Sequence, residues 1–216
     1  VTDASLRYAQ GRAAETVLTH YLDALHKLGS ELSISSEMAE VAPEVLELAD
    51  ASQDDSAHRS DEPYRRAIIG IYNRLSVTFE RLVGRAPSRP PLGVGEAYDG
   101  PEELSADLRT LARALAGLGG ETLASQGALG RLIRSVRTFG FHLATLDMRQ
   151  NSAVHERVVA ELLEKAGVEA DYLELDEPAR IALLREELSG GRPLRSPWSE
   201  YSDETTGELA IIDAAA

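Results

Sequence analysis

Hydrophobic positions recur at intervals of three and four over most of this chain, which is the spacing of amphipathic helices. The first such stretch predicts a long helix from Asp3 to Leu32, which Gly29 and Ser30 end or kink. A second long helix is predicted from Glu62 to Gly84. Shorter helices are predicted from Glu37, over 43–50, from Pro101 to Gly119, over a stretch that ends at Gly140, after Ser152, over 177–188 and after Ser202. The pattern therefore indicates a mostly α-helical chain.

Two segments lack this periodicity and are predicted to be loops. Residues 85–100 are rich in Pro and Gly, which neither propagate a helix nor pair in a central strand. Residues 51–61 are polar and predict a mobile surface loop. Asp54, Asp55 and His58 in that loop could gather a cation, although so polar a loop is more often only solvated.

One segment, Phe141–Met148, predicts a strand, because its alternate positions are largely apolar on both faces. Such a strand is covered on both sides, as in a parallel sheet or a barrel, and it needs neighbouring strands that this sequence does not supply. The chain also starts at Val1 rather than at Met. Both observations lead us to expect a piece of a larger protein.

The amino-acid composition excludes several kinds of site and argues against several kinds of binding partner. The 216 residues include no cysteine, which excludes disulfides, thiolate metal sites and a cysteine nucleophile and favours a cytoplasmic location. Lys and Arg number 22 against 36 Asp and Glu, and the net charge of −14 argues against binding to nucleic acid or to an anionic membrane. No run of about 18 apolar residues predicts a membrane span.

Polar side chains gather where the predicted strand ends. Asp147 and Arg149 are two positions apart and so project to the same side, next to the amides of the following helix. An arginine there offers a planar fork for phosphate or carboxylate, whereas the alternative is an ion pair that only caps the strand. His155 is close enough to Arg149 in the sequence to share this site. The alternative is that His155 is an ordinary surface histidine. His142 is expected to be a hydrogen-bonded core histidine.

A second group of basic residues lies along one side of the helix that ends at Gly140. Three arginines follow one another at intervals of three, namely Arg131, Arg134 and Arg137. They could form an anion-facing ridge. The favoured alternative is that they offset the dipole at the end of their own helix.

Three segments resemble a known family. LDMRQNSAVH (146–155) resembles the Leu-Asp-Ile-Arg-Gln-x-Ser-x-x-His segment of bacterial and plant phosphoenolpyruvate carboxylases. DEPYRRAIIGIYNRL (61–75) resembles their Glu-Pro-Tyr-Arg segment, and SELSISSE (30–37) resembles their Glu-Leu-Ser-x-Ser turn. The segments occur in the family's order, so the resemblance covers nearly the whole chain.

The resemblance implies a fold and an activity. Family members are large, mainly helical enzymes built round an eight-stranded α/β barrel, and they assemble as homotetramers. With Mg²⁺ they add bicarbonate to phosphoenolpyruvate, through carboxyphosphate and the enolate of pyruvate, to give oxaloacetate and phosphate. Arg149 matches the arginine that contacts the substrate phosphate, Asp147 is its orienting partner, and His155 is a third candidate. At positions 148 and 151 this sequence has Met and Asn, where the family has isoleucine and more commonly glutamate. The arginine of the motif is retained as Arg149.

The resemblance also implies an internal fragment of about a quarter of the enzyme, inactive by itself. The family's catalytic histidine, loop arginines and metal-binding acids have no counterpart in this sequence. Residues 1–139 would form a mainly helical part, and residues 140–216 would supply one or two barrel strands followed by helices. The alternative is a non-catalytic helical scaffold or regulatory module that binds a protein partner.

Overall fold

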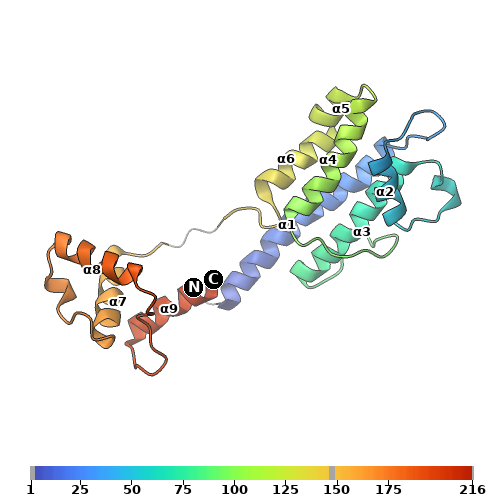
Figure 1. Ribbon diagram of the computed structural model, residues 1–216. Coiled ribbons are helices and arrows are strands. Elements are labelled where there is room, and N and C mark those ends of the chain that lie inside the picture. The colour runs from blue at the N-terminus through green and yellow to red at the C-terminus, as the bar shows by residue number, and fades with distance from the viewer. Residues whose placement is uncertain (1–2, 146–148, 216) are drawn as a thin grey trace. The chain divides into compact units, whose positions relative to one another are not determined.

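The computed structural model describes residues 3–145 and 149–215, and within them every regular element is helical. Two compact units divide the chain: Arg7–Thr145, and Leu146–Ala216 together with Val1–Leu6. The elements, coloured along the chain in Figure 1, are α1 (Asp3–Glu31), α2 (Pro43–Ala51), η1 (Ala57–Arg59), α3 (Pro63–Val83), α4 (Pro101–Gly117), α5 (Glu121–Gln126), α6 (Ala128–Phe139), α7 (Ser152–Lys165), η2 (Tyr172–Glu174), α8 (Glu177–Ser189) and α9 (Asp203–Ala215). The mostly α-helical prediction is confirmed.

Local signals in the sequence set several helix ends. Pro63 and Pro101 open α3 and α4, where the missing N–H costs nothing because the first turn has no intrahelical acceptor. Gly84 ends α3 in the left-handed region at φ 80°, and its N–H donates to the Glu80 carbonyl at 2.9 Å. Asn151 caps α7, accepting the Ala153 N–H at 2.9 Å.

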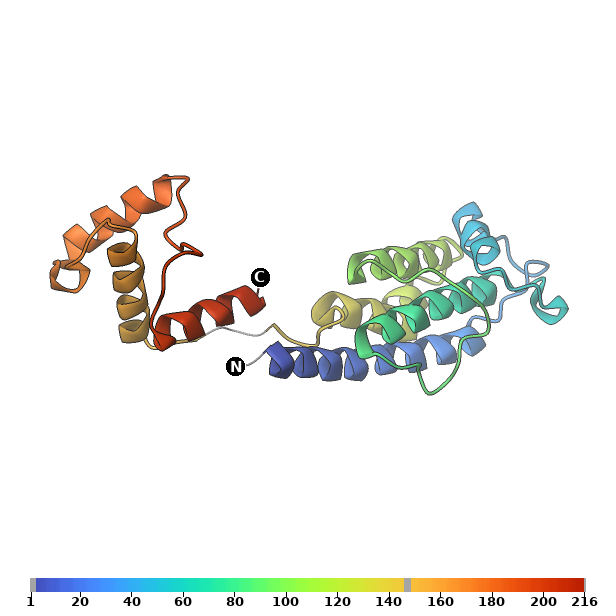
Figure 2. The ribbon, with the colours of Figure 1, turned by 90° about the horizontal axis from the view of Figure 1, so that it is seen from below.

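Helix α1 runs antiparallel to α3 in the larger unit (Figure 2). A Cβ at Gly11 would lie 4.0 Å from the Leu82 carbonyl, and one at Gly29 would lie 3.7 Å from a methyl carbon of Ile68. The helix does not end at Gly29 but continues to Glu31, with Gly29 lying against α3. Packing against a neighbour therefore outweighs the low helix propensity of a single glycine.

The core of the larger unit is formed by the apolar faces of α1, α3, α4 and α6. Its most buried side chains include Leu18, Tyr21, Leu25, Ile71, Leu75, Phe79, Leu104, Leu108, Leu111, Leu132 and Val136. All of these positions repeat at helical spacing along their own helix, as the periodicity predicts. No described helix is both long enough and apolar enough to cross a bilayer.

The predicted barrel strand at 141–148 is not formed in the part that the structure describes. Residues 141–145 make turns and bends, with the Leu143 N–H donating to the Phe139 carbonyl at 3.0 Å. Residues 146–148 lie outside the described residues. A single strand without neighbours leaves its backbone donors and acceptors unpaired, and here the chain forms turns that hydrogen-bond to Phe139, the last residue of α6. For the same reason His142 is exposed rather than part of the core.

Two smaller expectations also change. The predicted helix from Glu37 is only a series of turns. The loop at 51–61 contains η1 and is held by an ion pair, in which Arg59 donates from Nε and Nη2 to the two Asp54 carboxylate oxygens at 2.7 Å each. A bidentate pair of this kind fixes both side chains, so the loop has defined internal contacts.

The smaller unit has a small core. Its buried apolar side chains among the described residues are Val158, Leu163 and Tyr172. Polar contacts join α7 to α9, because the Glu161 carboxylate accepts the Ser202 N–H at 2.7 Å and the hydroxyls of Ser202 and Thr205 at 2.6 and 2.5 Å. These hydrogen bonds lower the pKa of Glu161, with the Ser202 hydroxyl the largest contribution.

Candidate functional site

The candidate phosphate-binding residues lie where the chain enters α7. Arg149 comes three residues before the first residue of this helix, and His155 lies in its first turn, both exposed. Asp147 lies outside the described residues, so its orienting role stays a prediction. No acidic residue occupies the first turn of α7. The helix N-terminus therefore adds positive potential beside Arg149, which favours an anion.

The segment that carries Arg149 is fixed by its neighbour Gln150. The Gln150 side chain donates from Nε2 to a Glu208 oxygen of α9 at 2.6 Å, and its Oε1 accepts the Asn151 N–H at 2.8 Å. A nearby pair joins the same helices, since Arg157 donates to both Glu204 oxygens at 2.9 and 2.6 Å. Helix α9 thus holds the entrance of α7 by side-chain contacts that periodicity in the sequence does not reveal.

The other two motif segments lie against each other in the larger unit. The Ser35 hydroxyl donates to Asp61 Oδ2 at 2.8 Å, and the Ser36 N–H donates to the Asp61 carbonyl at 2.7 Å. The Ser33 hydroxyl is hydrogen-bonded to Glu62, which also accepts from Arg65 at 3.0 Å. The segments 30–37 and 61–66 therefore form one hydrogen-bonded corner at the start of α3.

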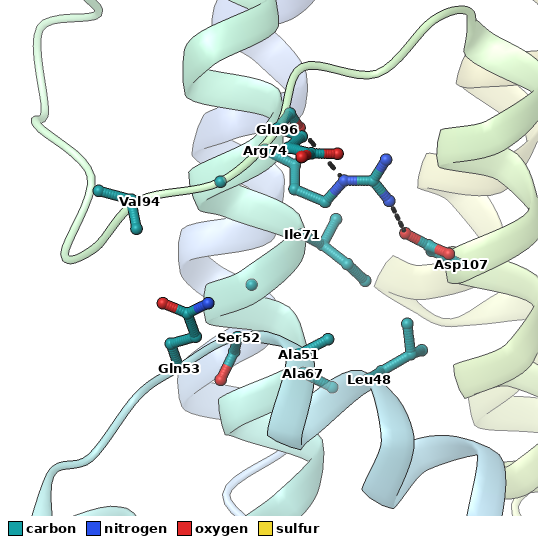
Figure 3. Close-up of a pocket in the computed structure, with 12 residues that line it drawn as sticks. Leu48, Ala51, Ser52, Gln53, Ala67, Ile71, Arg74, Val94, Glu96 and Asp107 are labelled. Atoms are coloured by element: carbon teal, nitrogen blue, oxygen red, sulfur yellow. Dashed lines mark hydrogen bonds and ion pairs between the residues drawn. The ribbon is translucent and has the colours of Figure 1, made fainter.

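A pocket of about 500 Å³ lies between α2, α3, α4 and residues 94–96 (Figure 3). Its apolar lining comes from Leu48, Ala51, Ala67 and Ile71. Arg74 lies along its edge, where it donates from Nη1 to Asp107 at 3.1 Å and from Nε to the Glu96 carbonyl at 3.3 Å. The pocket is thus part apolar and part charged.

Two neighbouring carboxylates compensate the positive charge of Arg74. It is paired with Glu103 as well as with Asp107, and its guanidinium carbon stacks 3.9 Å from the centre of the Tyr98 ring. The Tyr98 hydroxyl also donates to Asp107 at 2.8 Å. Burial raises the pKa of both Asp107 and Tyr98, whereas the hydrogen bond from Arg74 lowers the pKa of Glu103. An arginine neutralised by two carboxylates holds the fold together and leaves no net positive charge for a phosphate.

The arginines of α6 have a capping role. Arg131 donates to the Gln126 carbonyl at 3.0 Å, and Arg134 donates to the Ser125 carbonyl at 2.6 Å. Both acceptors lie at the C-terminal end of α5, where carbonyl groups have no intrahelical partner. These two arginines therefore cap the preceding helix, a role that neither the anion-facing ridge nor the offset of their own helix dipole had predicted.

The described residues do not fit a metal ion. Within 3–145 and 149–215, no three His, Cys, Asp or Glu side chains are grouped so that they could hold one. In the loop that could gather a cation, the Asp54 carboxylate is already bound by Arg59. The Mg²⁺ that the resemblance implies is accordingly assigned to none of these residues.

Comparison with known proteins supplies the family. The phosphoenolpyruvate carboxylase family profile matches residues 1–216. The phosphoenolpyruvate carboxylases of Azoarcus sp. (strain BH72) and Ralstonia nicotianae are 53% and 47% identical to the chain over 215 residues, covering 100% of it and 23% and 22% of their own lengths. That of Aromatoleum aromaticum is 54% identical over 202 residues, covering 94% of the chain and 22% of its own length. The chain spans less than a quarter of these curated relatives. Matched from end to end, it belongs to the phosphoenolpyruvate carboxylase family.

Proposed function

We propose that this chain is an internal segment of an enzyme that carboxylates phosphoenolpyruvate with bicarbonate, giving oxaloacetate and phosphate. The observation that carries the proposal is the position of Arg149, exposed beside the N-terminus of α7 in the family-specific segment. The names of the relatives support the reaction, since each is called a phosphoenolpyruvate carboxylase.

The proposed role of Arg149 is to bind the phosphate of phosphoenolpyruvate. Transfer of the phosphoryl group to bicarbonate concentrates negative charge on the phosphate oxygens, and a guanidinium stabilises that charge without exchanging a proton. Arg149 would bind two oxygens through its planar fork, and the first amides of α7 would add to the positive potential. Asp147 would orient the guanidinium, and His155 would lie at the edge of the same site.

The small core of the 146–216 unit supports a longer parent protein. Large apolar side chains are exposed there, among them Leu173, Ile181, Leu188, Trp198 and Ile212, and α8 buries none of its residues. A unit with so few buried side chains gains little stability from its own core. In the complete enzyme these surfaces would be covered, and residues 140–148 would add to an α/β barrel whose other strands come from the rest of the chain.

Several further properties belong to the same proposal. The complete enzyme would be a cytoplasmic homotetramer that uses Mg²⁺, with the ligands for the ion supplied by residues outside this chain. The division between a helical part at 1–139 and a part at 140–216 stays a prediction. The isolated 216-residue chain would be inactive, so metal-dependent formation of oxaloacetate by the purified chain would contradict this proposal.

The test replaces Arg149 in the full-length enzyme. Arg149→Ala is expected to lower kcat/KM for phosphoenolpyruvate by about 10²–10³-fold, in the range observed when one charge-stabilising donor is removed. Arg149→Lys should recover part of the loss, because it restores the charge but not the fork. The matched control is Arg137→Ala, which removes an exposed arginine in the last turn of α6 and should leave turnover unchanged. Near-normal kinetics of Arg149→Ala would remove this residue from the site.

A further inference from the structure

A carboxylate of α9 contacts the residue that follows Arg149. Glu208 accepts a hydrogen bond at 2.6 Å from Nε2 of Gln150, 58 positions away in the sequence. Oε1 of the same side-chain amide accepts the Asn151 N–H at 2.8 Å. The two partners also fix the orientation of the amide, because an N–H needs an oxygen acceptor and a carboxylate needs a donor. Both ends of the Gln150 side chain are therefore engaged, one by the backbone and one by α9.

The residues after Gln150 enter α7 along a course that is held by hydrogen bonds. Asn151 has the extended conformation of a helix cap, with φ −69° and ψ 132°, and its side chain accepts the Ala153 N–H at 2.9 Å. Its carbonyl accepts the Val154 N–H at 2.9 Å. Arg149 is joined to Gln150 by one peptide bond, which places their Cα atoms about 3.8 Å apart. The position of the Gln150 backbone therefore decides where the Arg149 side chain begins.

Helix α9 holds Glu208 in place through further contacts with α7. Glu204 and Glu208 are four positions apart and so lie on the same side of α9. Glu204 accepts both hydrogen bonds of Arg157, at 2.9 and 2.6 Å. Thr205, which is 1% exposed, donates its hydroxyl to Glu161 at 2.5 Å. This side of α9 is thus fastened to α7 within one compact unit, and it presents Glu208 to the entrance of that helix.

We propose that Glu208 is a positioning residue for Arg149, acting through its hydrogen bond to Gln150. The inference rests on the proposed function, because it assigns Glu208 to the support of the same phosphate site. In this role Glu208 does not bind the phosphate, and its own negative charge is unfavourable beside an anion. Its benefit comes from the hydrogen bond, which holds the backbone from which Arg149 extends. A displacement of about 1 Å at a binding group is enough to slow a reaction strongly.

The experiment separates the hydrogen bond from the charge by two substitutions in the full-length enzyme. Glu208→Ala removes both, and we expect kcat/KM for phosphoenolpyruvate to fall by about threefold to tenfold. Glu208→Gln keeps an oxygen acceptor for Gln150 and should stay within about twofold of the wild type. The matched control is Asp213→Ala, which removes another carboxylate of α9, bonded to Arg195 at 2.9 and 2.8 Å. Its kcat/KM should also stay within about twofold of the wild type.

Double variants test whether Glu208 acts through Gln150 and Arg149. In an Arg149→Ala background, Glu208→Ala should lower kcat/KM by less than about twofold, because the group that it positions is gone. Gln150→Leu removes the same hydrogen bond from the other side, so adding Glu208→Ala to it should cause no further loss. Equal activities of Glu208→Ala and Asp213→Ala, equal losses in Glu208→Ala and Glu208→Gln, or a loss that persists without Arg149 would overturn the inference.

Failure of this inference is distinguishable from failure of the proposed function. If Arg149→Ala lowers turnover strongly and Glu208→Ala leaves it unchanged, the proposed function stands and Glu208 loses its role. If Arg149→Ala keeps near-normal kinetics, Arg149 leaves the site, and the positioning role of Glu208 is overturned with it.

Discussion

The Ser35 hydroxyl donates a 2.8 Å hydrogen bond to the carboxylate of Asp61, and the next residue, Ser36, binds the Asp61 backbone carbonyl. The two residues belong to two of the segments that carry the family resemblance, 30–37 and 61–75. Ser33 and Glu62 form a second contact beside the first. The motif residues therefore build a corner between the end of α1 and the start of α3, and this gives them a structural role.

This corner should contribute measurably to stability. Ser35→Ala removes a hydrogen bond to a charged acceptor that is only half-buried, so we expect a loss of about 1 kcal/mol in the free energy of unfolding. Urea unfolding of the 216-residue chain measures it. Ser60→Ala is the control, because the Ser60 hydroxyl only donates to the Ala57 carbonyl in its own turn.

A double-mutant cycle with Asp61→Ala then tests whether the two side chains act together. We expect a coupling free energy of about 0.5–1.5 kcal/mol between Ser35 and Asp61. Strictly additive losses would show that the hydrogen bond contributes nothing of its own.

Close packing of α2 on α3 predicts a strong effect at Gly70. A Cβ there would lie 2.9 Å from Cβ and 3.1 Å from Cα of Ser52, a residue that is 3% exposed. Gly70→Ala should therefore lower the free energy of unfolding by about 1–3 kcal/mol, although alanine favours the helix. Gly11→Ala is the matched change in α1, where the nearest atom would be 4.0 Å away, and it should stabilise the chain by about 0.5–1 kcal/mol. Stabilisation by Gly70→Ala would contradict the observed packing.

The ion pair of Asp54 and Arg59 predicts a dependence of stability on pH. The hydrogen bond from Arg59 holds the pKa of Asp54 below its ordinary value of 3.8. A carboxyl whose pKa is lowered by folding stabilises the protein above its unfolded pKa, and this contribution is lost as the pH falls through the lower, folded value. Asp54→Asn should thus cost about 1–3 kcal/mol at pH 7, and the cost should shrink below pH 3.8.

Unfolding of both proteins by urea between pH 7 and pH 3 measures this difference. Asp55→Asn is the control, since it removes a neighbouring exposed carboxylate and should change the free energy of unfolding little. A cost of Asp54→Asn that stays the same at every pH would argue against a lowered pKa.

Local signals in the sequence determined most of the helical architecture. The helix predicted from Glu62 to Gly84 is α3, which Pro63 opens and Gly84 ends, and Asn151 caps α7. These features are predictable because helix hydrogen bonds, caps and proline effects involve residues within four positions of one another. The motif around Arg149 is also local, and it was sufficient to predict the family that the comparisons confirm.

Contacts between distant residues were decided only by the tertiary structure. Periodicity cannot show that Arg74 meets Asp107, that Arg134 caps α5, or that Tyr21 binds Gly140, because each pairing depends on how separate helices pack. The predicted strand failed over 141–145 for the related reason that a strand is completed by neighbours outside itself. Sequence by itself thus determined the helices and the family, whose signals are local, whereas packing in three dimensions decided which polar groups pair.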